Sequence, residues 1–366
     1  MSNELVVTPT ATPRPRPEAD GSTAPVLTDH AFFMRTGKRR TWQGLTVADR
    51  DAIPALRPTA AAVLAGQTVV DTFTAYRTAD GTVAVFRPDS HIKRLNNGAR
   101  RLALPQVDFD RVWTSVRAMV ELDQGWLPET PGAALHLRAV LAADGTGLAP
   151  SPADHCLFYV LAWVADPTGS AGKPVRAMTL DGYVRAWPGG TGDVNDAGSL
   201  AAGVVPGEVA ANYGYDQVLW LDGPQGRFVQ QIGNLNAFFV IDGVLTTPAL
   251  DRSVLPGVTR DSVVKLARDS GTPVVERPVE LAEVLKGIAD GTVTECFATS
   301  TEVGVAPVTG LGHQGEEYRI AAGPAGEEAG PVTARFRGLL DGIHRGEAVD
   351  RFGWMRRLTE VAPVHA

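Results

Sequence analysis

Two Asp-Gly pairs, Asp222-Gly223 and Asp242-Gly243, limit how the second half of this chain can fold. Such a pair favours a tight turn between antiparallel strands, because glycine readily adopts the positive φ angle that the turn needs. The apolar segments that flank them are 217–221 with 227–232, and 237–241 with 243–246. The pattern therefore predicts two β-hairpins.

Helices are predicted on both sides of these hairpins. Asp108 can cap a helix whose apolar side chains recur at helical spacing, at Val112, Trp113, Val116, Met119 and Val120. Thr259 is expected to cap a second helix that runs to about Asp269 and ends near Gly271. Residues 156–165 form the longest apolar run and are expected to be a buried strand. This mixture predicts an α/β (α+β) fold in two lobes.

The length of 366 residues allows a large core and favours two domains. The boundaries that we expect are an extended or disordered arm at 1–26, a small N-terminal α/β domain at 27–168, an interdomain connection at 169–182 and a large C-terminal domain at 183–366.

Charge and composition exclude several classes of function. The net charge of −7 argues against a nucleic-acid surface. The run at 156–165 is too short to span a bilayer, and residues 1–25 lack the apolar stretch of a signal peptide. The two cysteines and the histidines show no metal-ligand spacing. A reduced, cytoplasmic protein without a metal, a membrane or a nucleic-acid partner is the expectation.

Residues 183–193 and several motifs at similar spacing resemble the branched-chain amino acid aminotransferases, which use pyridoxal phosphate (PLP) and have fold type IV. The matching segments are Ala75-Tyr76-Arg77, Leu135-His136-Leu137-Arg138, Gly233-Asn234-Leu235-Asn236 and Leu255-Pro256-Gly257-Val258-Thr259-Arg260. The resemblance covers nearly the whole chain and implies a two-domain fold-type-IV structure. It also implies a homodimer, which is the commonest closed assembly.

The chain departs from the family pattern around the cofactor. Asn195 stands where the family has the lysine that bonds covalently to PLP, and an amide nitrogen cannot form that bond. Gln231 replaces a glutamate that pairs with the pyridine nitrogen, and Glu302 follows Thr301 in the segment that matches the phosphate cradle. Only Arg94 matches a phosphate-binding arginine of the family. We therefore expect that PLP is absent and that no cofactor is used.

An empty cofactor cleft between the lobes would be lined by a new set of side chains. By family position, the expected acid or base groups are Asp71, His136, Asp196 and Glu302, and the expected substrate-binding residues are Arg138, Asn195, Gln231, Arg94 and Thr301. Four of them also have a plain structural interpretation: His136 as a hydrogen-bonded strand residue, Arg138 as half of an ion pair, Asp196 and Glu302 as solvated surface charges.

The function that we expect is a PLP-independent enzyme of specialised metabolism acting on an amino-acid-derived substrate. An imine-forming condensation or cyclisation of the Pictet–Spengler type is a concrete example, because it needs an acid and a base but no PLP. Two alternatives stay open: a noncatalytic binding or regulatory homologue, and a residual PLP-dependent branched-chain transaminase that holds its cofactor noncovalently.

Overall fold

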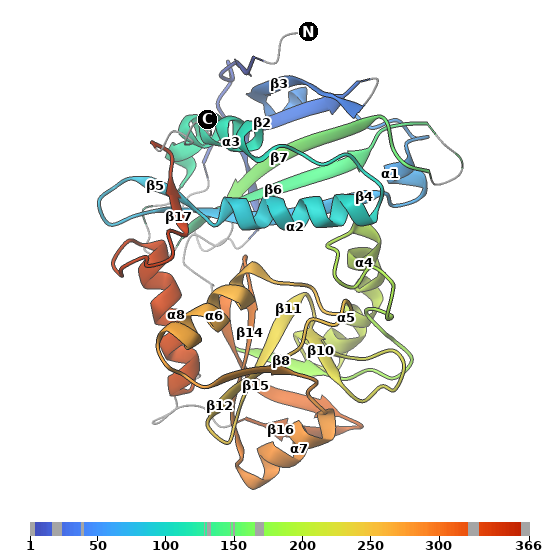
Figure 1. Cartoon of the computed structure of the whole chain (residues 1–366), viewed down its shortest axis with the longest axis vertical. Helices are drawn as coiled ribbons and strands as arrows, with labels where there is room; N and C mark the ends of the chain where they lie inside the picture. The colour runs from blue at the N-terminus through green and yellow to red at the C-terminus, as the bar shows by residue number, and fades with distance from the viewer. Residues whose placement is uncertain are drawn as a thin grey trace. The chain divides into compact units, whose positions relative to one another are not determined.

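The chain divides into two compact units in the computed structural model (Figure 1). Unit 1 comprises Met1–Ser170 and Gly342–Ala366, and unit 2 comprises Ala171–Asp341. The residues that the structure describes are 4–16, 24–37, 40–127, 129, 133–146, 148, 151–164, 172–320 and 329–359. Parts of the predicted arm (1–3 and 17–23), of the predicted connection (169–171) and the last residue of the predicted strand at 156–165 lie outside these ranges.

Unit 1 is built on an eight-stranded sheet with the strand order β1-β3-β2-β7-β6-β4-β5-β17. Its strands are β1 (Val6–Val7), β2 (Val26–Thr36), β3 (Trp42–Asp49), β4 (Thr68–Arg77), β5 (Val83–Phe86), β6 (Ala134–Ala143), β7 (Cys156–Val164) and β17 (Met355–Arg357). Its helices are α1 (Ala61–Leu64), α2 (Pro88–Arg101) and α3 (Phe109–Asp123), with 3-10 turns at Arg50–Ala52 and Gln124–Trp126. Helix α2 runs along β4, as Figure 1 shows, and helix α3 packs on β2 and β3.

Unit 2 is built on a nine-stranded sheet with the order β10-β9-β8-β15-β14-β11-β12-β13, and β16 pairs with β15. Its strands are β8 (Val175–Met178), β9 (Gln217–Leu221), β10 (Val229–Ile232), β11 (Leu235–Ile241), β12 (Val244–Pro248), β13 (Val274–Arg277), β14 (Val293–Ser300), β15 (Gly304–His313) and β16 (Glu316–Arg319). Its helices are α4 (Ala197–Ala202), α5 (Val204–Asn212), α6 (Val258–Asp269), α7 (Leu281–Asp290) and most of α8 (Pro331–His344). Mixed strands and helices in both units confirm the predicted α/β (α+β) fold.

The local predictions are confirmed in part. Asp108 caps α3, because its side chain accepts the N–H of Arg111 at 3.0 Å. The turn at Asp242-Gly243 joins β11 and β12, and both residues have positive φ. The predicted cap at Thr259 is wrong: helix α6 begins at Val258 and its cap residue is Gly257, which offers no side chain to the first turn.

The two faces of the unit 2 sheet carry different side chains. Phe239 and Cys296 belong to an apolar core that includes Leu281 and Val284 of α7. Residues next to them along each strand point to the opposite face, because side chains alternate along a strand. On that second face, Glu295 accepts the N–H groups of Val332 and Thr333 at 2.9 and 2.8 Å and so caps α8.

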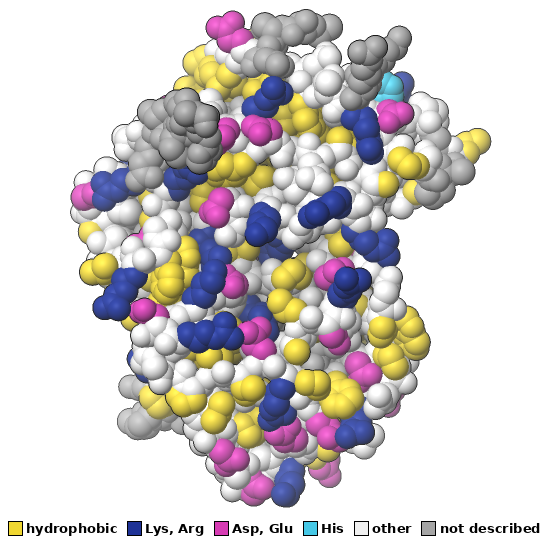
Figure 2. Space-filling view, viewed as in Figure 1, with side chains coloured by type: hydrophobic (Ala, Val, Ile, Leu, Met, Phe, Trp, Pro, Cys, Tyr) yellow, Lys and Arg dark blue, Asp and Glu magenta, His cyan; other side chains and the backbone are white. Residues whose placement is uncertain are grey.

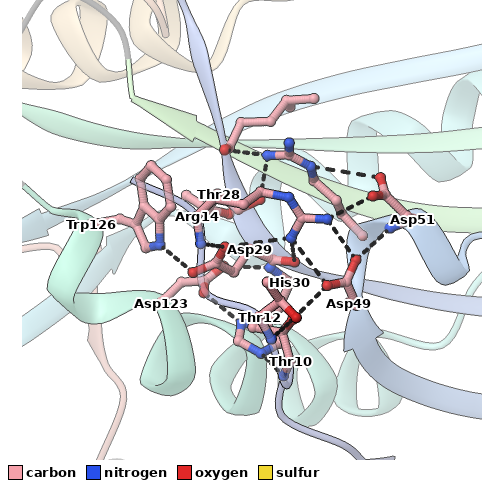
Figure 3. Close-up of polar contacts among 12 residues, drawn as sticks. Thr10, Thr12, Arg14, Thr28, Asp29, His30, Asp49, Asp51, Asp123 and Trp126 are labelled. Carbon is pink, nitrogen blue, oxygen red and sulfur yellow. Dashed lines mark hydrogen bonds and ion pairs between the residues drawn. The ribbon is translucent and has the colours of Figure 1, made fainter. Parts of the chain in front are cut away.

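One arginine holds the segment before β2 against unit 1 (Figure 3). Arg14 donates through Nη2 to Asp49 at 2.9 Å and to Asp51 at 2.7 Å, and its backbone N–H donates to Asp29 at 2.9 Å. The hydrogen bond from Arg14 holds the pKa of the Asp49 carboxyl well below its usual range. Residues 4–16 therefore form an ordered strap that is tied by charge.

A histidine supplies the second anchor of this strap. The backbone N–H of Thr10 donates to Nε2 of His30 at 2.9 Å, and Nδ1 of His30 lies 2.6 Å from a carboxylate oxygen of Asp123 (Figure 3). Because Nε2 accepts a hydrogen bond, the ring proton of neutral His30 lies on Nδ1 and is donated to Asp123.

On the face drawn in Figure 2, lysine and arginine side chains are interspersed with aspartate and glutamate. Among the helices that the structure describes, none is long and apolar enough to cross a membrane. Within the same residues, no group of three or more His, Cys, Asp or Glu side chains could hold a metal ion.

Candidate functional site

The residues predicted for the site fall into two groups, one in each unit. Asp71, Arg94, His136 and Arg138 belong to unit 1, whereas Asn195, Asp196, Gln231, Thr301 and Glu302 belong to unit 2. A single cleft that contains all of them stays a prediction.

Asp71 lies on the face of the unit 1 sheet that α2 covers. Its fully buried carboxylate accepts Nε and Nη2 of Arg94 at 2.7 and 2.8 Å and lies 2.7 Å from Nδ1 of His91. Burial acts to raise the pKa of Asp71, but the charges of Arg94 and His91 outweigh it and the pKa is lowered. Asp71 is therefore ionised, and its contacts orient Arg94.

His136 and Arg138 lie on the opposite face of the same sheet. The His136 ring stacks on Trp163 with ring centroids 5.2 Å apart, and the guanidinium of Arg138 lies 4.9 Å from the centre of the same indole. Nε of Arg138 donates to the hydroxyl of Thr72 at 3.1 Å. One tryptophan thus holds both side chains in a stack.

In unit 2, the loop 189–196 carries Asn195 and Asp196. Asp196 caps the short helix α4, because its carboxylate accepts the backbone N–H of Ser199 at 2.9 Å and the Ser199 hydroxyl at 2.6 Å. Asn195 precedes Asp196 and is half-buried.

Two side chains of the β10–β11 hairpin fix the loop 251–257, which leads into α6. The backbone N–H of Leu255 donates to Oε1 of Gln231 at 2.7 Å, and Nδ2 of Asn236 donates to the carbonyl of Leu255 at 2.8 Å. A side chain at Gly257 would place its Cβ 2.0 Å from Oδ1 of Asn236, so any larger residue there would displace the Asn236 amide. The start of α6 is thereby pressed against the sheet.

Gln231, Asn236 and Thr299 form a polar row across three neighbouring strands, because Gln231 pairs with Asn236 and Asn236 with Thr299. Paired residues project from the same face of a sheet. Thr299 is only 1% exposed, and its hydroxyl has no hydrogen-bond partner in the described part of the chain. A buried hydroxyl without a partner is costly, so a bound ligand group would stabilise it.

The turn between β14 and β15 carries Thr301 and Glu302. The hydroxyl of Ser300 accepts the N–H of Val303 at 3.2 Å, and Gly304 has a φ of +70°, which together close the turn. Thr301 is half-buried at the end of the polar row, and Glu302 is exposed.

Sequence reasoning did not single out Thr299, Asn236 or Arg185 as site residues. Nη2 of Arg185 donates to the carbonyls of Gly192 and Ser253, the first at 2.6 Å. Burial lowers the pKa of Arg185 to about 10, so the guanidinium stays charged near neutral pH. The pairing of Asn236 with Thr299 depends on strand register, and no local pattern in the sequence reveals it.

Comparison with known proteins gives a consistent result. The family model for amino-transferase class IV matches residues 68–311. The chain is 38% identical over 340 residues to a branched-chain-amino-acid aminotransferase of Mycobacterium tuberculosis (strain ATCC 25618 / H37Rv), which covers 90% of each chain. It is 34% identical over 358 residues to branched-chain-amino-acid aminotransferase 2 of Bacillus subtilis (strain 168), which covers 96% of each.

Solved structures share the fold. The Escherichia coli branched-chain amino acid aminotransferase superposes with a TM-score of 0.72 at 22% identity, over 90% of this chain and 100% of that one. The enzyme of Thermobaculum terrenum, solved in its PLP form, gives 0.71 at 18% identity, over 91% of this chain and 99% of that one.

These comparisons overturn two expectations. The hypothesis of a PLP-independent condensation or cyclisation is wrong, because relatives that match along nine-tenths of the chain are named aminotransferases. The expectation that no cofactor is used is wrong for the same reason, and the Thermobaculum terrenum enzyme was solved in its PLP form. The departures at Asn195, Gln231 and Glu302 change side chains only, whereas a helix N-terminus binds phosphate through backbone N–H groups, which side-chain substitutions leave in place.

Proposed function

Because the chain belongs to the amino-transferase class IV family, we propose that it transfers the amino group of a branched-chain amino acid with PLP as cofactor. The observation that carries this proposal is the identity of 38% to the M. tuberculosis aminotransferase over 340 residues. The departures at Asn195 and Gln231 indicate a residual form of this activity, in which the cofactor is held noncovalently.

The polar row of unit 2 fits the phosphate of such a cofactor. The buried Thr299 hydroxyl has no partner among the described residues, and a phosphate oxygen would accept a hydrogen bond from it. Gly257 leaves the first turn of α6 without a side-chain cap, and the N-terminus of a helix attracts anions. Thr301, two residues beyond Thr299, would add a second hydroxyl.

Gln231 fits the ring of the cofactor in an unusual way. Since its Oε1 accepts the N–H of Leu255, the atom of the Gln231 amide that is left to face the ring is Nε2. An amide N–H donates, so it would favour an unprotonated pyridine nitrogen. When bound, PLP supplies the electron sink that permits loss of the proton on the amino acid's α-carbon, and an unprotonated ring is the weaker sink.

Lys265 and Lys286 of unit 2 are engaged in ion pairs and do not replace the amine that position 195 lacks. Lys265 forms a surface ion pair with Asp261 at 2.9 Å, and Lys286 lies 3.9 Å from Asp290. We therefore assign the movement of the substrate proton to the carboxylate of Asp196, the residue after Asn195. The two bonds from Ser199 orient this carboxylate.

The proposal is tested by adding PLP to the purified protein and following absorbance and protein fluorescence. Leucine, valine and isoleucine are then supplied with a 2-oxo acid acceptor, and the new 2-oxo acid is measured. We expect saturable binding and turnover that requires added PLP. If PLP does not bind and none of the three amino acids is converted, the proposal fails.

Asp196→Asn tests the assigned proton acceptor. Asparagine is as good a helix cap as aspartate, so the fold should be kept, but an amide cannot take up the proton. We expect turnover to fall by about 10²–10⁴-fold while PLP affinity and thermal stability stay near those of the parent. Unchanged turnover would remove Asp196 from the mechanism.

A further inference from the structure

Arg185 lies between two loops of the candidate site that are distant in sequence. Its Nη2 atom donates to the carbonyl of Gly192, in the loop that carries Asn195, and to the carbonyl of Ser253, in the loop that leads into α6. A single nitrogen therefore bridges the two loops. Arg185 is half-buried, although Val184 beside it is 50% exposed.

The two loops touch through their backbones at this bridge. A Cβ added to Gly192 would lie 2.7 Å from Cα of Ser253 and 2.8 Å from its carbonyl oxygen. Any residue larger than glycine would push the loops apart. Arg185 and Gly192 therefore both determine the distance between the two loops. Arg185 donates to a carbonyl of each loop, and Gly192 has no Cβ that would hold the loops apart.

Ser253 also connects the bridge to strand β10, which carries Gln230. Its hydroxyl accepts Nε2 of Gln230 at 2.7 Å and donates to Asp251 at 2.6 Å. Leu255, two residues further on, is held by Gln231. The Arg185 bridge is thus continuous with the hydrogen bonds that fix the start of α6.

The hydrogen bonds of Arg185 are unusual for a half-buried cation. Its Nη2 atom donates to two backbone carbonyls, whereas Asp196 and Asp251 act on it through their charge. Burying a guanidinium without a bonded carboxylate costs free energy, which its contacts must offset. An ion pair on the surface could hold two loops together without that cost. A half-buried arginine bonded to two carbonyls instead fixes the position of both loops relative to one nitrogen atom.

We propose that Arg185 is a positioning residue, which sets the spacing between the Asn195 loop and the start of helix α6 and thereby the affinity of the site for PLP. This inference rests on the proposed function. The effect of Arg185 on the spacing of the loops can be measured without cofactor. A failure of this inference can therefore be told apart from a failure of the proposed function.

The first test compares amide hydrogen exchange in the protein without cofactor, for Arg185→Gln and for the parent. The reporters are the N–H of Val194, which donates to Thr191, and the N–H of Leu255, which donates to Gln231. We expect both to exchange at least about tenfold faster in the variant, while the paired strands at Phe239 and Cys296 do not change. Unchanged exchange at both reporters would overturn the proposal.

Gly192→Ala separates the same loops by a different route, and it keeps the proposal testable if Arg185→Gln fails to fold. It should accelerate the same two amides and weaken PLP binding in the same direction. Gly207→Ala is its matched control, because a Cβ there meets nothing within 4 Å. Arg337→Gln is the control for the arginine, since Arg337 also binds two backbone carbonyls of unit 2, those of Val305 and Gly172.

The second test is a fluorescence titration with PLP. We expect Arg185→Gln to weaken binding by at least about tenfold, and Arg185→Lys to fall between it and the parent, because an ammonium lacks the planar fork of a guanidinium. Melting temperatures should shift no more than in Arg337→Gln. If the loops loosen but the PLP affinity stays at the parent value, Arg185 is a structural residue and the proposal is wrong.

Discussion

The backbone N–H of Leu255 donates to Oε1 of Gln231 at 2.7 Å, and this one bond fixes which end of the Gln231 amide faces the loop before α6. Gln231 is 1% exposed, so the bond is formed away from water. Through this hydrogen bond, Gln231 of strand β10 fixes the position of the loop 251–257.

Gln231→Met should therefore lower the free energy of unfolding by about 1–3 kcal/mol, because methionine fills similar space but leaves the Leu255 N–H without its acceptor. Urea denaturation near neutral pH measures the change. Gln225→Met is the control at an exposed position. A loss no larger than that of the control would mean that water or another group replaces the acceptor.

The fold could be predicted from the sequence because its signals are local. Asp108 is a typical cap residue and lies at the start of α3, and Asp242-Gly243 is a typical turn pair and lies between β11 and β12. The error at Thr259 has a physical reason: Gly257 caps α6 without a side chain, so the usual cap signal is missing.

The site was harder to predict because its contacts are not local. Thr299 reaches Asn236 through strand pairing, and Arg185 reaches Ser253 across 68 residues of sequence. The departure at Asn195 is visible in the sequence, but the backbone groups at the start of α6 are not. Cofactor use was therefore misjudged from side chains alone.

His344 gives the protein an acid-sensitive element in unit 1. Its ring stacks on Tyr76 with centroids 4.3 Å apart, and burial lowers its pKa from 6.5 to about 3. The unfolded chain takes up a proton at this residue below pH 6.5 and the folded chain does not. The stability that depends on neutral His344 is thus complete above pH 6.5 and is lost progressively as the pH falls toward 3.

His344→Phe keeps an aromatic ring and removes the titration. We expect the free energy of unfolding of the parent to fall between pH 7 and pH 4.5 by about 1–3 kcal/mol more than that of the variant. Denaturation curves at the two pH values provide the comparison. Parallel losses in both proteins would show that His344 does not titrate as described.

The strap of residues 4–16 should depend on the charge of Arg14. Arg14→Gln removes its bonds to Asp49 and Asp51 and leaves these carboxylates close to one another without a cation. We expect amide exchange at Thr8 and Thr10 to rise by roughly tenfold or more, with a smaller rise in Asp51→Asn, which removes one carboxylate. Equal protection in Arg14→Gln and the parent would mean that the β1 pairing and the hydrogen bond from Thr10 to His30 hold the strap without Arg14.

A homodimer is expected from the family resemblance, and the sequence mass of 38.7 kDa makes the test direct. Sedimentation at micromolar concentration should give twice that mass. A single species at the mass of one chain would refute the expectation.

Asn195→Lys asks how much of the family chemistry one side chain controls. We expect borohydride reduction to fix PLP covalently to the variant, as judged by intact mass, and to leave the parent unmodified.

Transamination by Asn195→Lys should nevertheless stay well below that of an ordinary family member, because the Gln231 amide keeps its orientation and favours an unprotonated ring nitrogen. Adding Gln231→Glu should then raise turnover further. Full activity in Asn195→Lys alone would show that the ring nitrogen matters little here and that the missing amine is the main defect of the site.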